Sequence, residues 1–322
     1  MRQDVQKWFA ARSYNAQQWS REELLARKEG RTVSVVLPAR NESATVGAIV
    51  AALRRELVEE VPLIDELVVI DSDSTDDTAA LAAAAGARVF SQDKILPAHG
   101  NVPGKGEALW KSLAVTNGEI VAFIDADLRE FDPGFAVGLL GPLLTEPGVQ
   151  FVKSCYDRPL DDGATIMPAG GGRVTELVAR PLLNLFWPQL AGIIQPLAGE
   201  YAASRRLLER LPFVSGYGVE IGMLIDVLAE VGLDGMAQVD LGVRRHRNSS
   251  DEALARMAMQ VQLTVQARRG SRTASGGHAA HLTQFLRQDD RFLAETCEIG
   301  VRERPPMAGV PEYAALLAGQ VA

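Results

Sequence analysis

Residues Glu119 to Leu128, Glu-Ile-Val-Ala-Phe-Ile-Asp-Ala-Asp-Leu, decide the fold class of this chain. The apolar run 120–124 is typical of a buried β-strand, and it ends in Asp125 and Asp127. Alternate residues of an extended segment point the same way, so both carboxylates are expected to face one spot. They repel each other unless a cation lies between them, and hard oxygen ligands suit Mg²⁺ or Mn²⁺ bound to substrate phosphates. The stretch therefore predicts a divalent-cation site at the end of a strand.

Short apolar runs alternate with helical periodicity through the first half of the chain. The predicted strands are 33–37, 67–70, 89–90 and 120–124, and the predicted helices between them are 45–59, 76–85 and 107–115. Repeated strand–helix units predict a doubly wound, mostly parallel sheet in an α/β protein. Ligands bind beyond the carboxyl ends of such strands, where Pro38, Asp71 and Asp125 lie. The second half is predicted to be mixed α/β, and the tail after Ser271 to be irregular and then helical.

Composition narrows the class of protein. The chain has 322 residues, of which 47% are hydrophobic and 23% charged, as in ordinary globular proteins. Its net charge of −8 argues against nucleic acid as a partner. Two distant cysteines, Cys155 and Cys297, indicate no disulfide framework and fit a reducing cytosol. The N-terminus lacks a signal-peptide core, and charges and prolines interrupt the apolar stretch 177–203, so we expect a cytoplasmic protein without a membrane span.

Polar segments follow the first two predicted strands. Short side chains in 38–42 and 71–78 are suited to hold a nucleoside, because carboxylates accept hydrogen bonds from ribose hydroxyls. The alternative is that Asn41 and residues 74–77 only cap helices. Either segment alone favours the capping alternative, but both together, followed by Asp125-Ala126-Asp127, favour nucleotide binding.

Lys105 lies between two glycines before a predicted helix. Its charge is suited to a phosphate, although a lysine between glycines is more often a solvated turn. The spacing of a P-loop is missing.

Two further segments carry groups that bind anions. In 170–175, Gly-Gly-Gly-Arg-Val-Thr, free backbone amides, Arg173 and Thr175 suit a phosphate or carboxylate, and a flexible hinge is an equal alternative. In 244–248, Arg-Arg-His-Arg-Asn, the arginines indicate an anion, and His246 is either a third metal ligand beside Asp127 or a surface residue.

Glu220 follows Ser215-Gly216-Tyr217-Gly218-Val219 near the start of a predicted helix. The helix macrodipole alone explains an acidic residue there. The functional alternative is a hydrogen bond from Glu220 to a sugar or acceptor hydroxyl.

Together these motifs resemble the glucosyl-3-phosphoglycerate synthases of actinobacteria, which are retaining glycosyltransferases of the GT-A fold. The resemblance runs from about Thr32 to Tyr313 and includes the segments 303–307 and 311–313. It implies transfer of glucose from UDP-glucose to the 2-hydroxyl of 3-phosphoglycerate, on the way to glucosylglycerate and methylglucose lipopolysaccharide. It also implies a divalent cation, Mg²⁺ ahead of Mn²⁺ or Co²⁺, and a homodimer.

The resemblance assigns roles to individual residues. The donor would contact Pro38, Ala39, Glu42, Ser72, Lys105, Asp125, Ala126, Asp127 and Tyr217, and the acceptor Gly172, Arg173, Thr175, Arg244 and Asn248. Asp127 and His246 would bind the cation, and Glu220, Asp125 and Lys105 would act in catalysis. One departure is Arg40, where the family pattern reads Pro-Ala-Leu-Asn-Glu, and it leaves room for another nucleotide base.

We therefore expect a helical arm at 1–30, a nucleotide-sugar-binding half at 31–128 and an acceptor-binding half at 129–250. Residues 251–322 would form a C-terminal helix and tail and the dimer contact. The alternatives are a mannosyl-3-phosphoglycerate synthase that uses GDP-mannose, a polyprenyl-phosphate sugar transferase, and a non-catalytic nucleotide-sugar sensor. A sugar-1-phosphate nucleotidyltransferase is disfavoured because its Gly-Gly-x-Gly-x-Arg loop is missing.

Overall fold

A computed structural model describes residues 1–157, 160–161, 166–167, 172–244, 250–270, 278–288 and 291–320. Its centre is an eight-stranded sheet in the order β1 (Ser13–Asn15), β11 (Met236–Val243), β6 (Phe151–Asp157), β9 (Tyr201–Ser204), β5 (Ile120–Phe123), β2 (Val33–Ala39), β3 (Glu66–Asp71) and β4 (Arg88–Ser91). All neighbours pair in parallel except β9, which is antiparallel to both β5 and β6. The predicted mostly parallel α/β sheet is confirmed.

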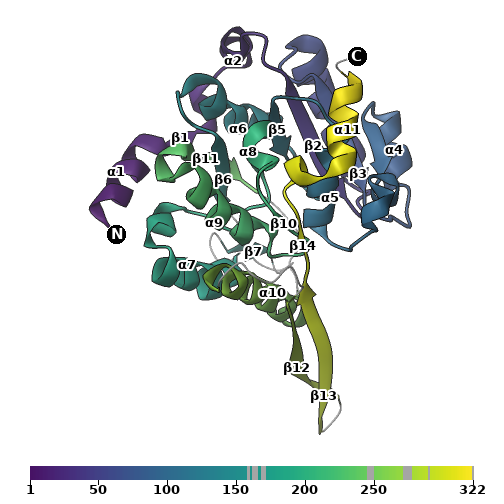
Figure 1. The fold of residues 1–322 in the computed structure, drawn as a ribbon, viewed down its shortest axis with the longest axis vertical. Helices are drawn as coiled ribbons and strands as arrows, with labels where there is room; N and C mark the ends of the chain where they lie inside the picture. The colour runs from purple at the N-terminus through teal and green to yellow at the C-terminus, as the bar shows by residue number, and fades with distance from the viewer. Residues whose placement is uncertain are drawn as a thin grey trace.

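Helices cover both faces of this sheet (Figure 1). They are α1 (Gln3–Arg12), α2 (Arg21–Lys28), α3 (Val46–Arg54), α4 (Thr78–Ala84), α5 (Lys105–Ser112), α6 (Gly134–Thr145), α7 (Arg180–Phe186), α8 (Arg205–Leu208), α9 (Val219–Val231), α10 (Asp251–Arg269) and α11 (Pro311–Gln320). None of the helices in the described part of the chain is both long and apolar enough to cross a membrane.

The central strands β2, β3 and β5 are mostly apolar because they are buried on both faces. Val36 and Val68 pack in one core with α5 and α9, whereas Val35 and Val69 pack in the other with α3 and α6. In the observed parallel register Ala39 lies beside Asp71 and Val36 beside Phe123, so the side chains that follow β2, β3 and β5 lie at the same edge of the sheet.

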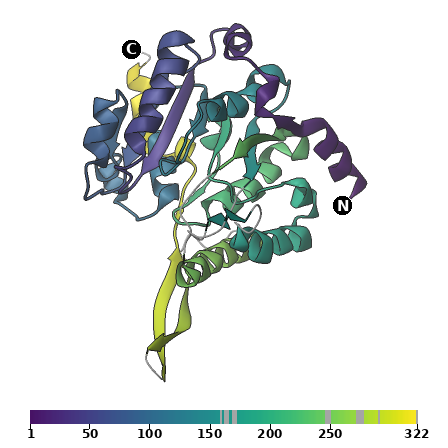
Figure 2. The same cartoon turned by 180° about the vertical axis from the view of Figure 1, so that it is seen from behind.

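Three small antiparallel pairs lie outside the main sheet. They are β7 (Leu160–Asp161) with β8 (Ile166–Met167), β10 (Phe213–Val214) with β14 (Glu303–Arg304), and β12 (His278–Gln288) with β13 (Arg291–Val301). The β12–β13 hairpin extends well away from the body of the molecule in both views (Figures 1 and 2). The prediction of an irregular tail after Ser271 is therefore wrong for 278–301, because each strand is stabilised by pairing with the other rather than by local pattern.

The N-terminal segment differs from the expected helical arm in one respect. Helices α1 and α2 are present, but Ser13–Asn15 between them forms the edge strand β1 and pairs with β11. Trp8 in α1 is buried and donates a hydrogen bond to the Met236 carbonyl at 2.9 Å. Residues 1–30 are thus integrated with the far edge of the sheet.

Candidate active site

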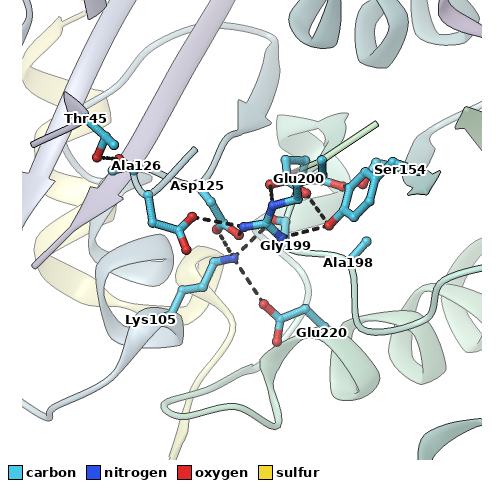
Figure 3. A network of polar contacts seen from close by, with 12 residues as sticks. Thr45, Lys105, Asp125, Ala126, Ser154, Ala198, Gly199, Glu200 and Glu220 are labelled. Carbon is cyan, nitrogen blue, oxygen red and sulfur yellow. Dashed lines mark hydrogen bonds and ion pairs between the residues drawn. The ribbon is translucent and has the colours of Figure 1, made fainter. Parts of the chain in front are cut away.

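The end of β5 places two carboxylates beside each other. Asp125 and Asp127 follow the strand, and the Thr45 hydroxyl donates a hydrogen bond to the intervening Ala126 carbonyl at 2.6 Å (Figure 3). The Asp125 side chain is 17% exposed and that of Asp127 is 43% exposed. Asp127 is therefore the carboxylate that is more accessible to a ligand.

Lys105 lies at the start of α5 and joins three segments (Figure 3). Its ammonium group pairs with Asp125, lies 3.2 Å from Glu220 Oε1 in the first turn of α9, and donates to the Gly199 carbonyl at 3.2 Å. A side chain at Gly199 would collide with both Asp125 and Lys105. Burial alone would lower the pKa of Lys105, but the charges of Asp125, Glu220 and Glu200 outweigh it and raise the pKa, so the side chain stays cationic. The three residues predicted to be catalytic thus lie in contact.

Arg244 bridges the two aspartates. One of its terminal nitrogens donates to Asp125 Oδ2 at 2.8 Å and to Asp127 Oδ1 at 3.0 Å. The other donates to the Tyr156 hydroxyl at 2.9 Å, and Nε lies 3.5 Å from Glu200 Oε1. The residue predicted to contact the acceptor therefore lies at the aspartate pair in this structure.

This geometry fits a divalent cation. Oxygens of Asp125 and Asp127 converge on a single guanidinium nitrogen, so both carboxylates can face one positive centre. Both are hard oxygen donors of the kind that Mg²⁺ and Mn²⁺ prefer. No group of three acidic, histidine or cysteine side chains suited to a metal occurs in the described ranges, and His246 and Asn248 lie outside them.

The predicted nucleoside loops bond to each other. Glu42 donates its amide to Thr78 Oγ1 at 2.8 Å, and Ser72 donates its hydroxyl to Gln92 at 2.8 Å. Asp76 accepts amide hydrogens from Ser43 at 3.2 Å and from Thr78 at 3.1 Å, so capping accounts for this carboxylate. Pro38 and Ala39 close β2 opposite Ile70 and Asp71.

Asp71 differs from its neighbours in these loops. It is only 9% exposed, and its Oδ1 has no hydrogen-bond partner among the described residues. A buried carboxylate oxygen without a partner is costly unless a ligand or water supplies a donor. The sequence placed Asp71 at the strand ends where ligands are expected to bind, but its unpaired oxygen is visible only in the fold.

The predicted acceptor loop is described from Gly172 onward. Gly172 has φ of +83° and its carbonyl accepts the amide of Glu176 at 3.0 Å, opening the turn that leads through Thr175–Ala179 into α7. Arg173 forms an ion pair with Asp251 at the start of α10, and Thr175 is buried.

Tyr217, predicted to contact the donor, lies just before α9. It is 56% exposed and its amide donates to Gln260 at 2.8 Å.

Sequence reasoning missed a buried polar layer beneath the aspartates. Glu200 is fully buried, accepts a hydrogen bond from the Tyr156 hydroxyl at 2.8 Å and faces Arg244. Burial raises the pKa of Glu200, although Arg244 opposes the shift. The only sequence signal was a single acidic residue at the end of an apolar stretch, which does not reveal its partners.

Lys153, on β6, is also fully buried in this layer. It donates to the Ala198 carbonyl at 2.6 Å and lies 4.7 Å from the Tyr201 ring centroid. Burial lowers the pKa of Lys153 to about 7, partly offset by Glu220. Lys153 therefore gains or loses its proton near neutral pH, in the buried layer beneath the aspartates.

We expect Lys153 to make folding stability rise with pH above 7. Between the folded pKa and the ordinary value of 10.5, the unfolded chain binds the proton that the folded protein lacks. The free energy of unfolding then rises by up to about 1.4 kcal/mol per pH unit in that window. Urea unfolding of wild type and Lys153→Met from pH 7 to 9 measures how the free energy of unfolding of each protein depends on pH. The same pH dependence in both proteins would contradict the prediction.

The fold and the site define a class of protein. A mostly parallel sheet with paired aspartates after a central strand, beside polar loops on β2 and β3, is the architecture of a nucleotide-sugar glycosyltransferase of the GT-A type. The comparisons with known proteins agree with this class. The model of glycosyl transferase family 2 matches residues 34–196.

Relatives are similar over nearly the whole chain. Glucosyl-3-phosphoglycerate synthase of Mycolicibacterium smegmatis is 50% identical and covers 94% of this chain and 97% of that protein. The structure of mannosyl-3-phosphoglycerate synthase from Rubrobacter xylanophilus has a TM-score of 0.84 at 43% identity, over 94% of this chain and 97% of that one. Glucosyl-3-phosphoglycerate synthase of Mycobacterium tuberculosis, in complex with Mn²⁺, UDP-glucose and phosphoglyceric acid, has a TM-score of 0.77 at 50% identity, over 90% and 94%.

The chain therefore belongs to glycosyl transferase family 2, in the group that contains the glucosyl-3-phosphoglycerate synthases. The resemblance drawn from its motifs is confirmed.

Proposed function

We propose that this chain transfers glucose from UDP-glucose to the 2-hydroxyl of 3-phosphoglycerate with retention of configuration, using a divalent cation. The observation that carries the proposal is the convergence of Asp125 and Asp127 on one positive centre, next to the Lys105–Glu220 pair. The relative crystallised with Mn²⁺, UDP-glucose and phosphoglyceric acid supports the same substrates.

The donor would lie along the ends of β2, β3 and β5. Pro38, Ala39, Glu42 and Ser72 would contact the uridine, and the unpaired Oδ1 of Asp71 offers an acceptor for a hydroxyl or base hydrogen. Asp125 and Ala126 would hold the sugar side, and the exposed Tyr217 would cover the donor glucose.

Asp127, with His246 outside the described residues, would hold the cation. When bound, a cation such as Mg²⁺ stabilises the charge that grows on the leaving diphosphate. Relatives have been crystallised with Mn²⁺ or with Mg²⁺ and UDP, which supports a divalent ion, and we propose Mg²⁺. Arg244 occupies the space between the aspartates here and would release Asp127 as the ion enters.

Lys105 and Glu220 would act at the reacting sugar. The Lys105 ammonium adds a fixed positive charge beside Asp125, in a site that is already organised before substrate arrives. Glu220 would accept a hydrogen bond from the glucose or from the acceptor hydroxyl. Gly172, Arg173, Thr175 and Asn248 would hold the anionic groups of the acceptor and direct its hydroxyl toward the anomeric carbon, and such positioning supplies much of the rate.

Nucleotide release from several donors tests the proposal. The assay contains 3-phosphoglycerate, Mg²⁺ and either UDP-glucose or GDP-mannose, and we expect the higher kcat/KM with UDP-glucose. The Rubrobacter mannosyl-3-phosphoglycerate synthase and the exposed Arg40 at the end of β2 favour GDP-mannose as the second candidate donor. Arg40→Leu is the matched variant, since a changed donor ratio would assign base preference to this position. Absence of nucleotide release with every donor would contradict a transferase.

We also propose that the β12–β13 hairpin contacts a second copy of the chain. Its strands pair only with each other among the described residues, and Phe285 and Leu293 are 68% and 36% exposed. The base of the hairpin packs against α10 through Ile299 and Val301. In the part of the chain that the structure describes, its outer part has no such support, and a two-stranded ribbon without further packing is marginally stable in water, so a partner is expected to cover that part. Sedimentation analysis should show a dimer for wild type and a monomer for Phe285→Glu, and a monomeric wild type would contradict this assignment.

A further inference from the structure

The two-residue strand β14 follows the β12–β13 hairpin and pairs with β10, which lies just before the helix that carries Glu220. Glu303 and Arg304 pair with Val214 and Phe213 of β10. Ser215, the residue after β10, donates its amide to the Arg302 carbonyl at 2.8 Å and accepts the Arg302 amide at 3.2 Å through its hydroxyl. Hydrogen bonds therefore connect β14 and Arg302 to the segment that leads into α9 and Glu220.

Arg304 binds the first turn of α5. Its guanidinium donates to both carboxylate oxygens of Glu107, at 2.6 and 2.7 Å, and to the His99 carbonyl at 2.7 Å. Glu107 is fully buried, and Trp110 donates to the Pro305 carbonyl at 2.8 Å. A bidentate guanidinium–carboxylate pair fixes orientation as well as distance. Lys105 lies on the same turn, so Arg304 restrains the helix end that carries it.

The neighbouring residue of β14, Glu303, is linked to α9 rather than to α5. It pairs with Arg268 of α10, and Arg268 also binds both carboxylate oxygens of Asp226, at 2.8 to 3.1 Å. Asp226 is a buried residue of α9, the helix whose first turn carries Glu220. One dipeptide is thus linked to both helices that supply the Lys105–Glu220 pair.

The two helix starts also meet directly. The Gly106 amide donates to the Ser215 carbonyl at 3.1 Å, and Gly104, with φ of +121°, leaves no room for a side chain against that carbonyl. The 3.2 Å separation of Lys105 Nζ and Glu220 Oε1 therefore depends on how α5 sits against β10 and β14.

We infer that Arg304 is a positioning residue for the transfer reaction, which sets the Lys105–Glu220 geometry through its bidentate contact with buried Glu107. The inference rests on the proposed function of Lys105. Lysine keeps the charge of Arg304 but replaces the planar fork by a single flexible ammonium. Such a change allows α5 to shift without removing any group that touches substrate.

Arg304→Lys is the first test. A displacement of about 1 Å in a catalytic group can cost about a hundredfold in rate, so we expect kcat to fall by about ten- to a hundredfold while both KM values change little. The matched control is Arg205→Lys in α8. The Arg205 guanidinium donates to the carbonyl of Leu113, which caps the C-terminal end of α5, and to that of Gly118. Thermal unfolding of both variants compares their stability. An equal fall in kcat in both variants, or an unchanged kcat in Arg304→Lys, would overturn the inference.

A double-mutant cycle with Lys105→Met tests whether Arg304 acts through Lys105. Residues that act as one unit are non-additive, so we expect Arg304→Lys to lower kcat in wild type but not in the Lys105→Met background. The same factor in both backgrounds would overturn the inference and leave the proposed function intact. A wild-type kcat for Lys105→Met alone would overturn both. Glu107→Gln, which keeps the volume but loses the charge, serves in the same cycle if Arg304→Lys does not fold.

Discussion

Asp127→Ala is expected to lower kcat by about 10²- to 10³-fold, the usual loss when one electrostatic stabiliser of the transition state is removed. Asp127 is the more exposed of the two carboxylates that face Arg244 Nη2. Its removal leaves Asp125 as the single carboxylate paired with this nitrogen among the described residues. The reduced negative charge should weaken metal binding together with nucleotide-sugar binding. Steady-state kinetics over a Mg²⁺ series measure the effect.

Asp132→Ala is a matched control for Asp127→Ala. Asp132 follows in the same loop and accepts the Gly134 amide at 2.8 Å ahead of α6, so its removal tests local folding without touching the aspartate pair. Near-normal transfer by Asp127→Ala at saturating Mg²⁺ would remove the assigned role of Asp127.

Lys105→Met is expected to lower kcat by a similar factor of about 10²-fold or more, because the variant removes a preorganised charge from the site. Asp125 and Glu220 would then lose the ammonium group that lies between them, and their mutual repulsion would displace both. Lys105→Arg keeps a cation and should recover part of the activity, although a planar guanidinium replaces the compact ammonium group.

Two measurements distinguish a local effect at Lys105 from general destabilisation. Lys94→Met removes an exposed lysine that follows β4 and should keep wild-type kcat. The raised pKa of Lys105 also means that its charge persists across the working pH range, so the loss in Lys105→Met should be nearly constant with pH. A loss that disappears at high pH would contradict this assignment.

Much of the first half of the fold could be predicted because its signals are local. The runs 33–37, 67–70 and 120–124 are apolar except for Ser34 and show no alternation, since the strands they form are buried on both faces. Helix α9 (Val219–Val231) begins beside Glu220, where the sequence predicted the start of a helix.

Elements without a recognisable local pattern could not be predicted. Strand β9 has only four residues and runs antiparallel between β5 and β6, which are far from it in sequence. Helix α6 was missed because it is apolar on all sides and contains Pro142, so it shows no polar face. The β12–β13 hairpin depends on pairing between its own two halves.

In the candidate site too, residues within a local sequence motif could be predicted and residues without one could not. Lys105, Asp125 and Glu220 each follow a recognisable local motif, and the fold brings them together. Glu200 and Lys153 carry no motif, because a buried charged residue is distinguished only by the partners around it. The contact between Arg304 and Glu107 likewise joins segments that are 197 residues apart in the sequence.

The central claim is that the aspartate pair after β5 binds a sugar nucleotide, with Asp127 holding a divalent cation on the diphosphate and Asp125 holding the sugar side. Titration calorimetry of UDP-glucose into EDTA-treated protein, with and without added Mg²⁺, tests it most directly. We predict strong binding with Mg²⁺, and little binding without the ion or in Asp127→Ala. Equal affinity and turnover in the metal-free protein would contradict the account.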